Sequence, residues 1–135
     1  MTDPTALRAA AEGGDVDAMV ALALLLEEDL TGEDDEEGLQ DEVGGWLRRA
    51  AAAGHVRGVA EFGSFLWHVW KDEDAALPWL QRAADAGQAD AMAVLGDVYD
   101  FLGDIALAKR WYQAAADLGD PHARDNLAAL DRLTG

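Results

Sequence analysis

Residues 76–87 read ALPWLQRAADAG, and the same pattern returns in residues 108–119 as AKRWYQAAADLG. A third copy, VGGWLRRAAAAG, occupies residues 43–54, and a fourth, ALRAAAEGG at residues 6–14, has Ala6 in place of the tryptophan. The turn glycines that close the copies are 40, 33 and 32 residues apart: Gly14, Gly54, Gly87 and Gly119. A period in this range is typical of a repeat array, in which each unit is too small to bury its own apolar face. The copies therefore predict stacked repeats whose function is performed by a surface.

The apolar residues between the turn glycines recur at helical spacing, as Leu95, Val98, Tyr99 and Leu102 do. Each repeat also has a small residue four positions after its glycine and a large apolar one eight positions after it, as at Ala91 and Leu95. Since residues four apart share one helix face, each repeat is predicted to be a helix pair. We expect an all-α solenoid of stacked antiparallel pairs, with about eight helices near 5–12, 16–28, 42–53, 56–70, 73–86, 89–102, 105–117 and 121–133. N-cap aspartates are expected at Asp3, Asp72, Asp104 and Asp120.

Length and composition favour a single domain over residues 1–135. Half of the 135 residues are apolar and none is cysteine, so the chain can bury a core without disulfides and fits a reducing compartment. The first residues lack a basic segment followed by an apolar one, and no apolar stretch is long enough to span a bilayer. We therefore expect a cytoplasmic protein that does not interact with membranes.

The net charge of −17 is concentrated in the first third of the chain. Residues 1–45 hold 14 of the 27 acidic residues and only one of the ten basic ones. Ten of these carboxylates lie in an acidic insertion at residues 27–42, which we expect to be a solvated loop or interaction tail. This charge disfavours binding to nucleic acid and would attract a basic protein partner.

The repeat resembles the Sel1-like repeat family, bacterial relatives of the tetratricopeptide repeats, over essentially the whole chain. The pattern A-x-x-x-L-G/A is matched, with variations, at residues 18–23, 58–63, 91–96 and 123–128, and A-x-x-W-x-x-x-A-A-x-x-G at 76–87 and 108–119. The resemblance implies a right-handed superhelix used by scaffolds, adaptors and regulators. The turns inside the helix pairs depart from the family pattern in two ways. The turn is shortened at residues 71–72 and 103–104, and in the first unit it is expanded to the acidic insertion.

Three tryptophans recur at one position of the repeat, and they are predicted to be structural. Each would cover the joint between stacked units: Trp46, Trp79 and Trp111. The four turn glycines are predicted to be helix C-caps with positive φ.

A second set of residues differs in every copy and is predicted to bind a partner. In similar repeat proteins these first-helix positions line the concave face; here they are Val20, Ala21, Leu24, Glu61, Ser64, Val94, Asp97 and Asn126. Trp67 and Trp70 have no counterparts in the other repeats. Placed at i and i+3 they would share a helix side, either as binding anchors or as a cap on the core.

Catalytic, cofactor and metal sites are not predicted. Ser64 is the only serine, and its one candidate base is His68, one helical turn away and without a nucleophile elbow. The three histidines lack metal-ligand spacing, and the acidic insertion does not match a calcium loop. The sequence favours a non-enzymatic module.

Two functions fit these observations. The first is a scaffold or adaptor whose concave face binds a segment of another protein. The alternative is an acidic immunity-type or antitoxin-type inhibitor that masks a basic effector through residues 27–42.

Overall fold

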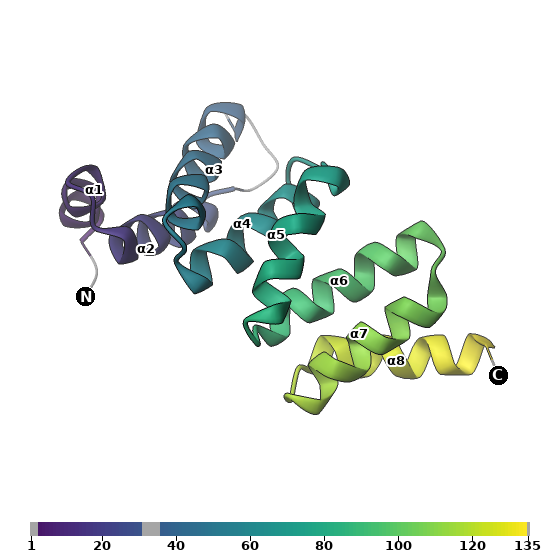
Figure 1. Ribbon diagram of the computed structural model, residues 1–135. Helices are drawn as coiled ribbons and strands as arrows, with labels where there is room; N and C mark the ends of the chain where they lie inside the picture. The colour runs from purple at the N-terminus through teal and green to yellow at the C-terminus, as the bar shows by residue number, and fades with distance from the viewer. Residues whose placement is uncertain (1–2, 31–35, 135) are drawn as a thin grey trace.

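The computed structural model describes residues 3–30 and 36–134, and the side chains of residues 36 and 37 are outside that description. The described residues form helices and turns only (Figure 1). The helices are α1 (Pro4–Glu12), α2 (Val16–Glu27), α3 (Glu36–Ala52), α4 (Val56–His68), α5 (Glu73–Asp85), α6 (Ala89–Leu102), α7 (Ile105–Asp117) and α8 (Pro121–Thr134). The all-α solenoid of stacked helix pairs is confirmed.

The turn glycines all end a helix in the same way. Each lies two residues beyond α1, α3, α5 or α7 and has a φ between 81° and 101°. The residue after the glycine then donates its backbone N–H to the carbonyl five residues earlier, as His55 does to Ala50 at 3.1 Å. This is the Schellman arrangement, in which a left-handed residue lets the last carbonyls of the helix find donors. The predicted positive φ is confirmed, and it reverses the chain after each of these helices.

Aspartate side chains begin most of the helices. Asp3, Asp72, Asp104 and Asp120 each accept a backbone N–H in the first turn that follows, as predicted. Inside the helix pairs, Lys71 and Gly103 occupy equivalent turns, and both have positive φ. The two-residue turns at 71–72 and 103–104 therefore combine a left-handed residue with an aspartate cap.

The acidic insertion is shorter than predicted. Helix α3 begins at Glu36, so residues 36–42 are helical rather than part of a solvated loop. Leu39 and Val43 are the reason: they are four residues apart, and both pack into the core cluster. Glu42 also accepts a bidentate pair of hydrogen bonds from Arg8 of α1, at 2.9 and 3.0 Å. Residues 31–35 lie outside the described residues, and the inhibitor role of the insertion stays a prediction.

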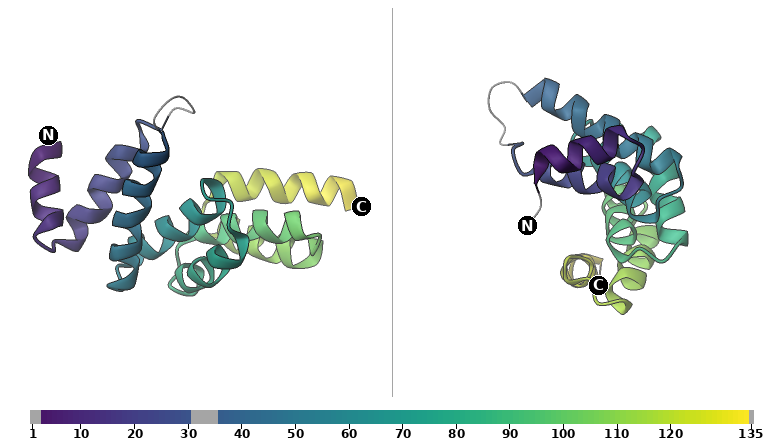
Figure 2. Two further views of the ribbon diagram at one scale, coloured as in Figure 1. Left: turned by 90° about the horizontal axis from the view of Figure 1, so that it is seen from above. Right: turned by 90° about the vertical axis from the view of Figure 1, so that its left-hand side faces the viewer.

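Packing runs mainly from each helix to the next along the chain. The helices that follow a turn glycine also touch one another across repeats, α4 with α6 and α6 with α8. Among the described residues, α3, α5 and α7 make no comparable contact with each other. Closer spacing marks the inner side of a curve, and Figure 2 shows the helices following a curved path. We call α2, α4, α6 and α8 the inner row.

The residue after each repeated tryptophan is the more deeply buried of the two. Leu47 and Leu80 are fully buried, and Tyr112 is 1% exposed. Trp46 is buried as predicted, but Trp79 and Trp111 are only partly buried against the core. The structural role of the tryptophans at the joints between units stays a prediction, and for Trp79 and Trp111 it would be performed by a ring that is only partly buried.

The Trp79 and Trp111 rings are partly exposed because neighbouring positions point about 100° apart around a helix. Arg49 lies over the Trp46 ring and Arg82 over the Trp79 ring, both at 5.0 Å from the ring centroid. The arginine is three residues after the tryptophan in both cases, so each pair is a local cation–π contact on one helix face. The W-x-x-R spacing in the first two full repeats signals this arrangement.

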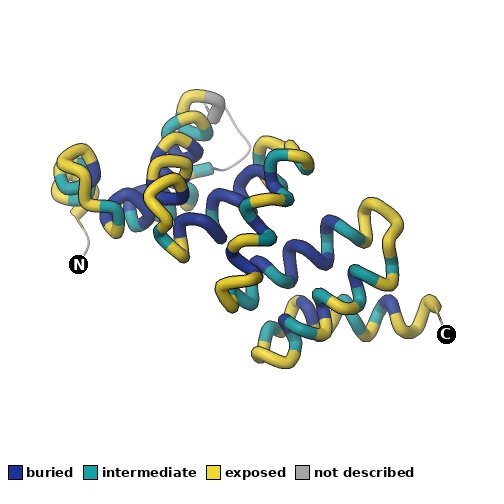
Figure 3. Tube along the Cα trace, viewed as in Figure 1, coloured by how far each residue is buried: buried dark blue, intermediate teal, exposed yellow. Residues whose placement is uncertain are grey.

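Glycines on the inner row allow the closest helix approaches. A Cβ on Gly63 would lie 2.9 Å from Leu80, and one on Gly96 would lie 2.4 Å from the Tyr112 ring. The buried residues form two apolar clusters, a large one over α1–α6 and a small one over α6–α8. Figure 3 shows this buried zone along the middle of the molecule and mostly exposed residues at the outer ends of α1 and α8.

Candidate functional site

The predicted partner-binding residues all lie on the inner row, but two of them are core. Val20 is 5% exposed and Val94 is 8% exposed, so neither offers a partner much surface. Both are apolar and belong to the large cluster, which corrects the prediction that they bind a partner. The other six are half-buried: Ala21, Leu24, Glu61, Ser64, Asp97 and Asn126. The candidate partner-binding surface of the inner row therefore consists of these six residues.

Asp97 is the centre of a polar cluster that joins the last three helices. Its carboxylate accepts the Tyr112 hydroxyl from α7 and the amide of Asn126 from α8, the latter at 3.2 Å. His122 Nε2 lies 3.1 Å from the same carboxylate. Burial and the bond to Asp97 raise the pKa of Tyr112, so its hydroxyl remains a donor. The structure thus brings Asp97 and Asn126 together, and their partners hold them in fixed positions.

Further polar contacts link the earlier repeats along the same row. His55 Nε2 of the turn before α4 lies 2.6 Å from Asp17 of α2. Arg57 pairs with Glu61 on its own helix and with Asp90 of α6 at 2.6 Å. Each repeat of the inner row is therefore tied to the next by at least one polar pair, which orders its surface before any partner arrives.

A shallow depression lies between α2 and α4, with a volume of about 340 Å³. Its lining includes Glu27 and Glu61, with Ser64 and Phe65 beside them. Burial and the neighbouring Glu61 raise the pKa of Glu27 to about 7. Burial also raises the pKa of Glu61, although Arg57 opposes the shift. Two half-buried carboxylates that repel each other form a site that favours a cation.

Replacing Glu27 by Gln is expected to stabilise the protein at pH 8. The native carboxyl has the higher pKa, so native protein binds this proton more tightly than unfolded chain does. The contribution of this tighter proton binding to the free energy of unfolding is complete below about pH 4.5 and is lost as the pH rises through about 7. We expect a gain of about 1–2 kcal/mol at pH 8, below the full linkage value because the side chain is only half-buried.

Guanidinium chloride titrations at pH 5 and pH 8 measure this effect. Glu28→Gln is the control, because it removes the same charge from an exposed neighbouring position. A gain that is the same at both pH values, or equal in the control, would contradict the raised pKa of Glu27.

Trp67 and Trp70 do not share a helix side. Helix α4 ends at His68, so Trp70 belongs to the turn that follows, and the i, i+3 argument fails. The Trp70 ring packs edge-on to Phe65 at 5.0 Å and against Gly44, whose Cβ would lie 2.5 Å from it. The Trp67 ring meets Phe101 of α6 edge-on at 5.6 Å. The anchor role of both residues stays a prediction.

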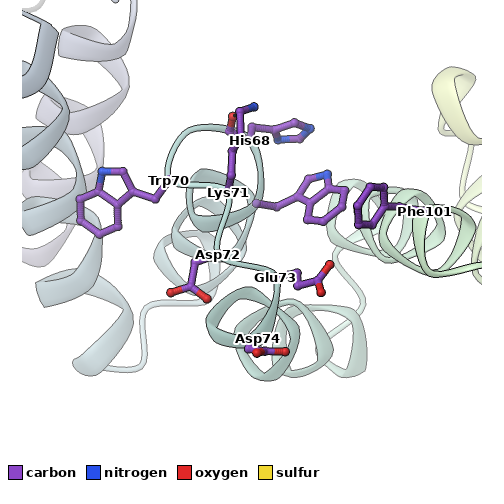
Figure 4. A pocket seen from close by; sticks show the side chains of 8 residues that line it. His68, Trp70, Lys71, Asp72, Glu73, Asp74 and Phe101 are labelled. Carbon is purple, nitrogen blue, oxygen red and sulfur yellow. The ribbon is translucent and has the colours of Figure 1, made fainter.

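These aromatic residues border a larger hollow, which we call the edge pocket. It has a volume of about 770 Å³ and lies where α4 ends, α5 begins and α6 ends. Its lining residues are Trp67, His68, Trp70, Lys71, Asp72, Glu73, Asp74 and Phe101. Figure 4 shows Trp70 directed away from Phe101, with the carboxylates of Glu73 and Asp74 between the two sides. Phe101 is 71% exposed, so an apolar ring borders an acidic hollow.

The possible catalytic pair is not assembled. His68 Nδ1 lies 3.1 Å from the backbone carbonyl of Ser64, and no bond joins its ring to the Ser64 hydroxyl in the described structure. The described residues also contain no group of three or more side chains suited to a metal ion. None of the helices in the described ranges has the length and apolar character needed to cross a bilayer.

Sequence reasoning missed several residues of these surfaces. No role was predicted for His122 or Tyr112, although they complete the Asp97 cluster. Only the spacing of His122 and Asn126, four residues apart, signals the contact. Phe101 gave a clearer signal, since it is a large apolar residue directly before Leu102, Gly103 and the end of a predicted helix.

The solved structures that are similar to this chain include two helical repeat proteins. One is a protective antigen present in uropathogenic Escherichia coli strains that displays an SLR fold, with 26% identity and a TM-score of 0.77. That match covers 92% of this chain and 27% of the antigen, so this chain spans about a quarter of it. The other is a Sel1 repeat protein from Oxalobacter formigenes, with 34% identity and a TM-score of 0.65, covering 96% of this chain and 99% of that one. No family model and no curated protein matches the chain.

Proposed function

The chain belongs to the Sel1 repeat family, whose fold is a protein-interaction module, and from this we propose that its inner row binds a positively charged segment of a partner protein. The role is that of a non-catalytic scaffold or adaptor. The observation behind the proposal is the pair of half-buried carboxylates, Glu27 and Glu61, in the depression between α2 and α4.

A cationic side chain in this depression would relieve an unfavourable arrangement. Burial disfavours the charged forms of both carboxylates, and Glu61 adds repulsion at Glu27 as Asp90 does at Glu61, where Arg57 opposes it. A lysine or arginine between them replaces that repulsion with attraction in a partly desolvated place, where ion pairs are stronger than at an open surface. Among the described residues Glu27 makes no ion pair of its own, so the partner would supply its cation.

The rest of the inner row supports an extended partner rather than a single side chain. The polar contacts from Asp17 to Asn126 fix the relative positions of the repeats. A surface that is already ordered loses little conformational entropy on binding. Ser64, Asp97 and Asn126 then offer hydrogen-bonding groups along one curved face.

The double variant Glu27→Gln/Glu61→Gln is expected to lose its partners. It removes two charges from the depression and keeps the shape of both side chains. The matched control is Glu28→Gln/Asp29→Asn, which removes two charges from exposed positions at the end of α2. Affinity for a partner should fall roughly tenfold or more in the double variant and little in the control.

Quantitative mass spectrometry after capture on immobilised protein measures the outcome. Wild type and control should retain the same proteins, and the double variant should release a subset of them. Thermal melts of all three chains show whether folding is intact. If the double variant and the control retain equal amounts of every protein, the inner row is not the binding face.

A further inference from the structure

The edge pocket has the composition of a site for an arginine side chain. Two aromatic rings, Trp67 and Phe101, meet edge-on at an angle of 71°, and most of the Phe101 ring is open to solvent. Three carboxylates and one lysine also line the hollow. Aromatic faces attract cations, and carboxylates accept hydrogen bonds from guanidinium groups.

The same chain already pairs arginine with aromatic faces. Arg49 over Trp46 and Arg82 over Trp79 both lie 5.0 Å from the ring centroid. Phe101 has no such partner among the described residues. A guanidinium from another protein would form with Phe101 the same cation–π contact that Arg49 and Arg82 form with tryptophans inside the chain.

Two of the carboxylates in the pocket, Glu73 and Asp74, are available to bind a guanidinium group. Asp72 is used as the N-cap of α5, where it accepts the N–H of Ala75 at 3.1 Å. The Lys71 amine donates to the carbonyl of His68 at 3.2 Å. Glu73 and Asp74 make no ion pair within the described residues, and they line the hollow together with Phe101.

We propose that the edge pocket binds an arginine in a basic segment of a partner protein. The guanidinium stacks on the Phe101 ring and pairs with Glu73 or Asp74, while the alkyl part of the side chain covers Trp67. This extends the proposed interaction function to a second surface, which meets the inner depression at His68. Arginine suits the site better than lysine because its planar group can stack and donate to carboxylates at once.

Titration of the full chain with a defined peptide tests the proposal. The probe is acetyl-Gly-Arg-Gly-Arg-Gly-amide, followed by the indole N–H signals of the ¹⁵N-labelled protein, with the Trp67 signal assigned through Trp67→Phe. The peptide should shift the Trp67 signal. Binding should weaken about fivefold in Phe101→Ala, and by a similar factor in Glu73→Gln/Asp74→Asn. A citrulline peptide of the same length should not bind.

Matched variants separate this pocket from other surfaces. Leu118→Ala removes an exposed apolar side chain of α7's end and Asp117→Asn an exposed charge, and neither should change binding. Glu27→Gln/Glu61→Gln should also leave the peptide-induced shift of the Trp67 signal unchanged. The proposal for the inner row and the proposal for the edge pocket can therefore be tested independently. The proposal is overturned if the peptide shifts only signals around Glu27 and Glu61, or if no signal moves at millimolar peptide. It is also overturned if the Trp67 signal shifts with protein concentration alone, because a second copy of the chain would then occupy the pocket.

Discussion

Replacing Tyr112 by Ala is expected to lower the free energy of unfolding by about 3–5 kcal/mol, a large share of the roughly 5–15 kcal/mol typical of a domain. The ring is 1% exposed and packs against Gly96, so its removal leaves a cavity between α6 and α7. The hydroxyl also donates to Asp97, which links both helices to α8. Guanidinium chloride unfolding followed by circular dichroism measures the loss.

Tyr112→Phe separates the ring from its hydroxyl. This variant keeps the packing and should cost only about 1–2 kcal/mol, because Asp97 retains His122 and Asn126 as partners. Trp111→Ala, at the adjacent and partly exposed position, should cost less than Tyr112→Ala. The reverse order for the two alanine variants would show that Trp111, not Tyr112, contributes more to the packing of α7.

Replacing Gly63 by Val is expected to cost about 2–3 kcal/mol through overpacking. The new Cβ would lie 2.9 Å from the Leu80 side chain and 3.0 Å from the Leu80 backbone nitrogen. A change of rotamer can move the side chain but not the backbone, so α4 and α5 must separate. Chemical denaturation at one pH is sufficient to measure the difference.

Gly45→Val is the control for this substitution. Gly45 also lies inside a helix, α3, but a Cβ there meets nothing within 4 Å. Since valine has a slightly higher helix propensity than glycine, this change should be neutral or mildly stabilising. Equal losses at both positions would show that the close approach of Leu80 does not control the cost at Gly63.

The fold could be predicted from the sequence because its signals are local. Helix caps such as Asp72 and the left-handed turn glycines depend only on residues close in the sequence. They also recur in several copies of the repeat. The start of α3 was placed too late because the acidic insertion masked a short apolar pattern, Leu39 and Val43. The deeper burial of Leu80 relative to Trp79 could not be predicted, because adjacent helical positions cannot be ranked without the neighbouring helix.

The candidate surfaces depended on features that are not local. The inner depression needs the approach of α2 to α4, which sets the pKa of Glu27, and no spacing within one helix encodes it. The sides faced by Trp67 and Trp70 were decided by where α4 ends, a boundary only two residues from the predicted one. A difference of two residues in where α4 ends does not change the fold, but it changes the direction in which the Trp70 side chain points.

The packing of each helix mainly on the next one also bears on how the chain reaches its native state. Few pairings require distant segments to find each other, so little loop-closure entropy is lost before contacts form. Such a topology belongs to the fast end of folding rates, in the microsecond to millisecond range. Assembly can also proceed in the order of synthesis, since a helix pair leaving the ribosome finds its packing partner already made.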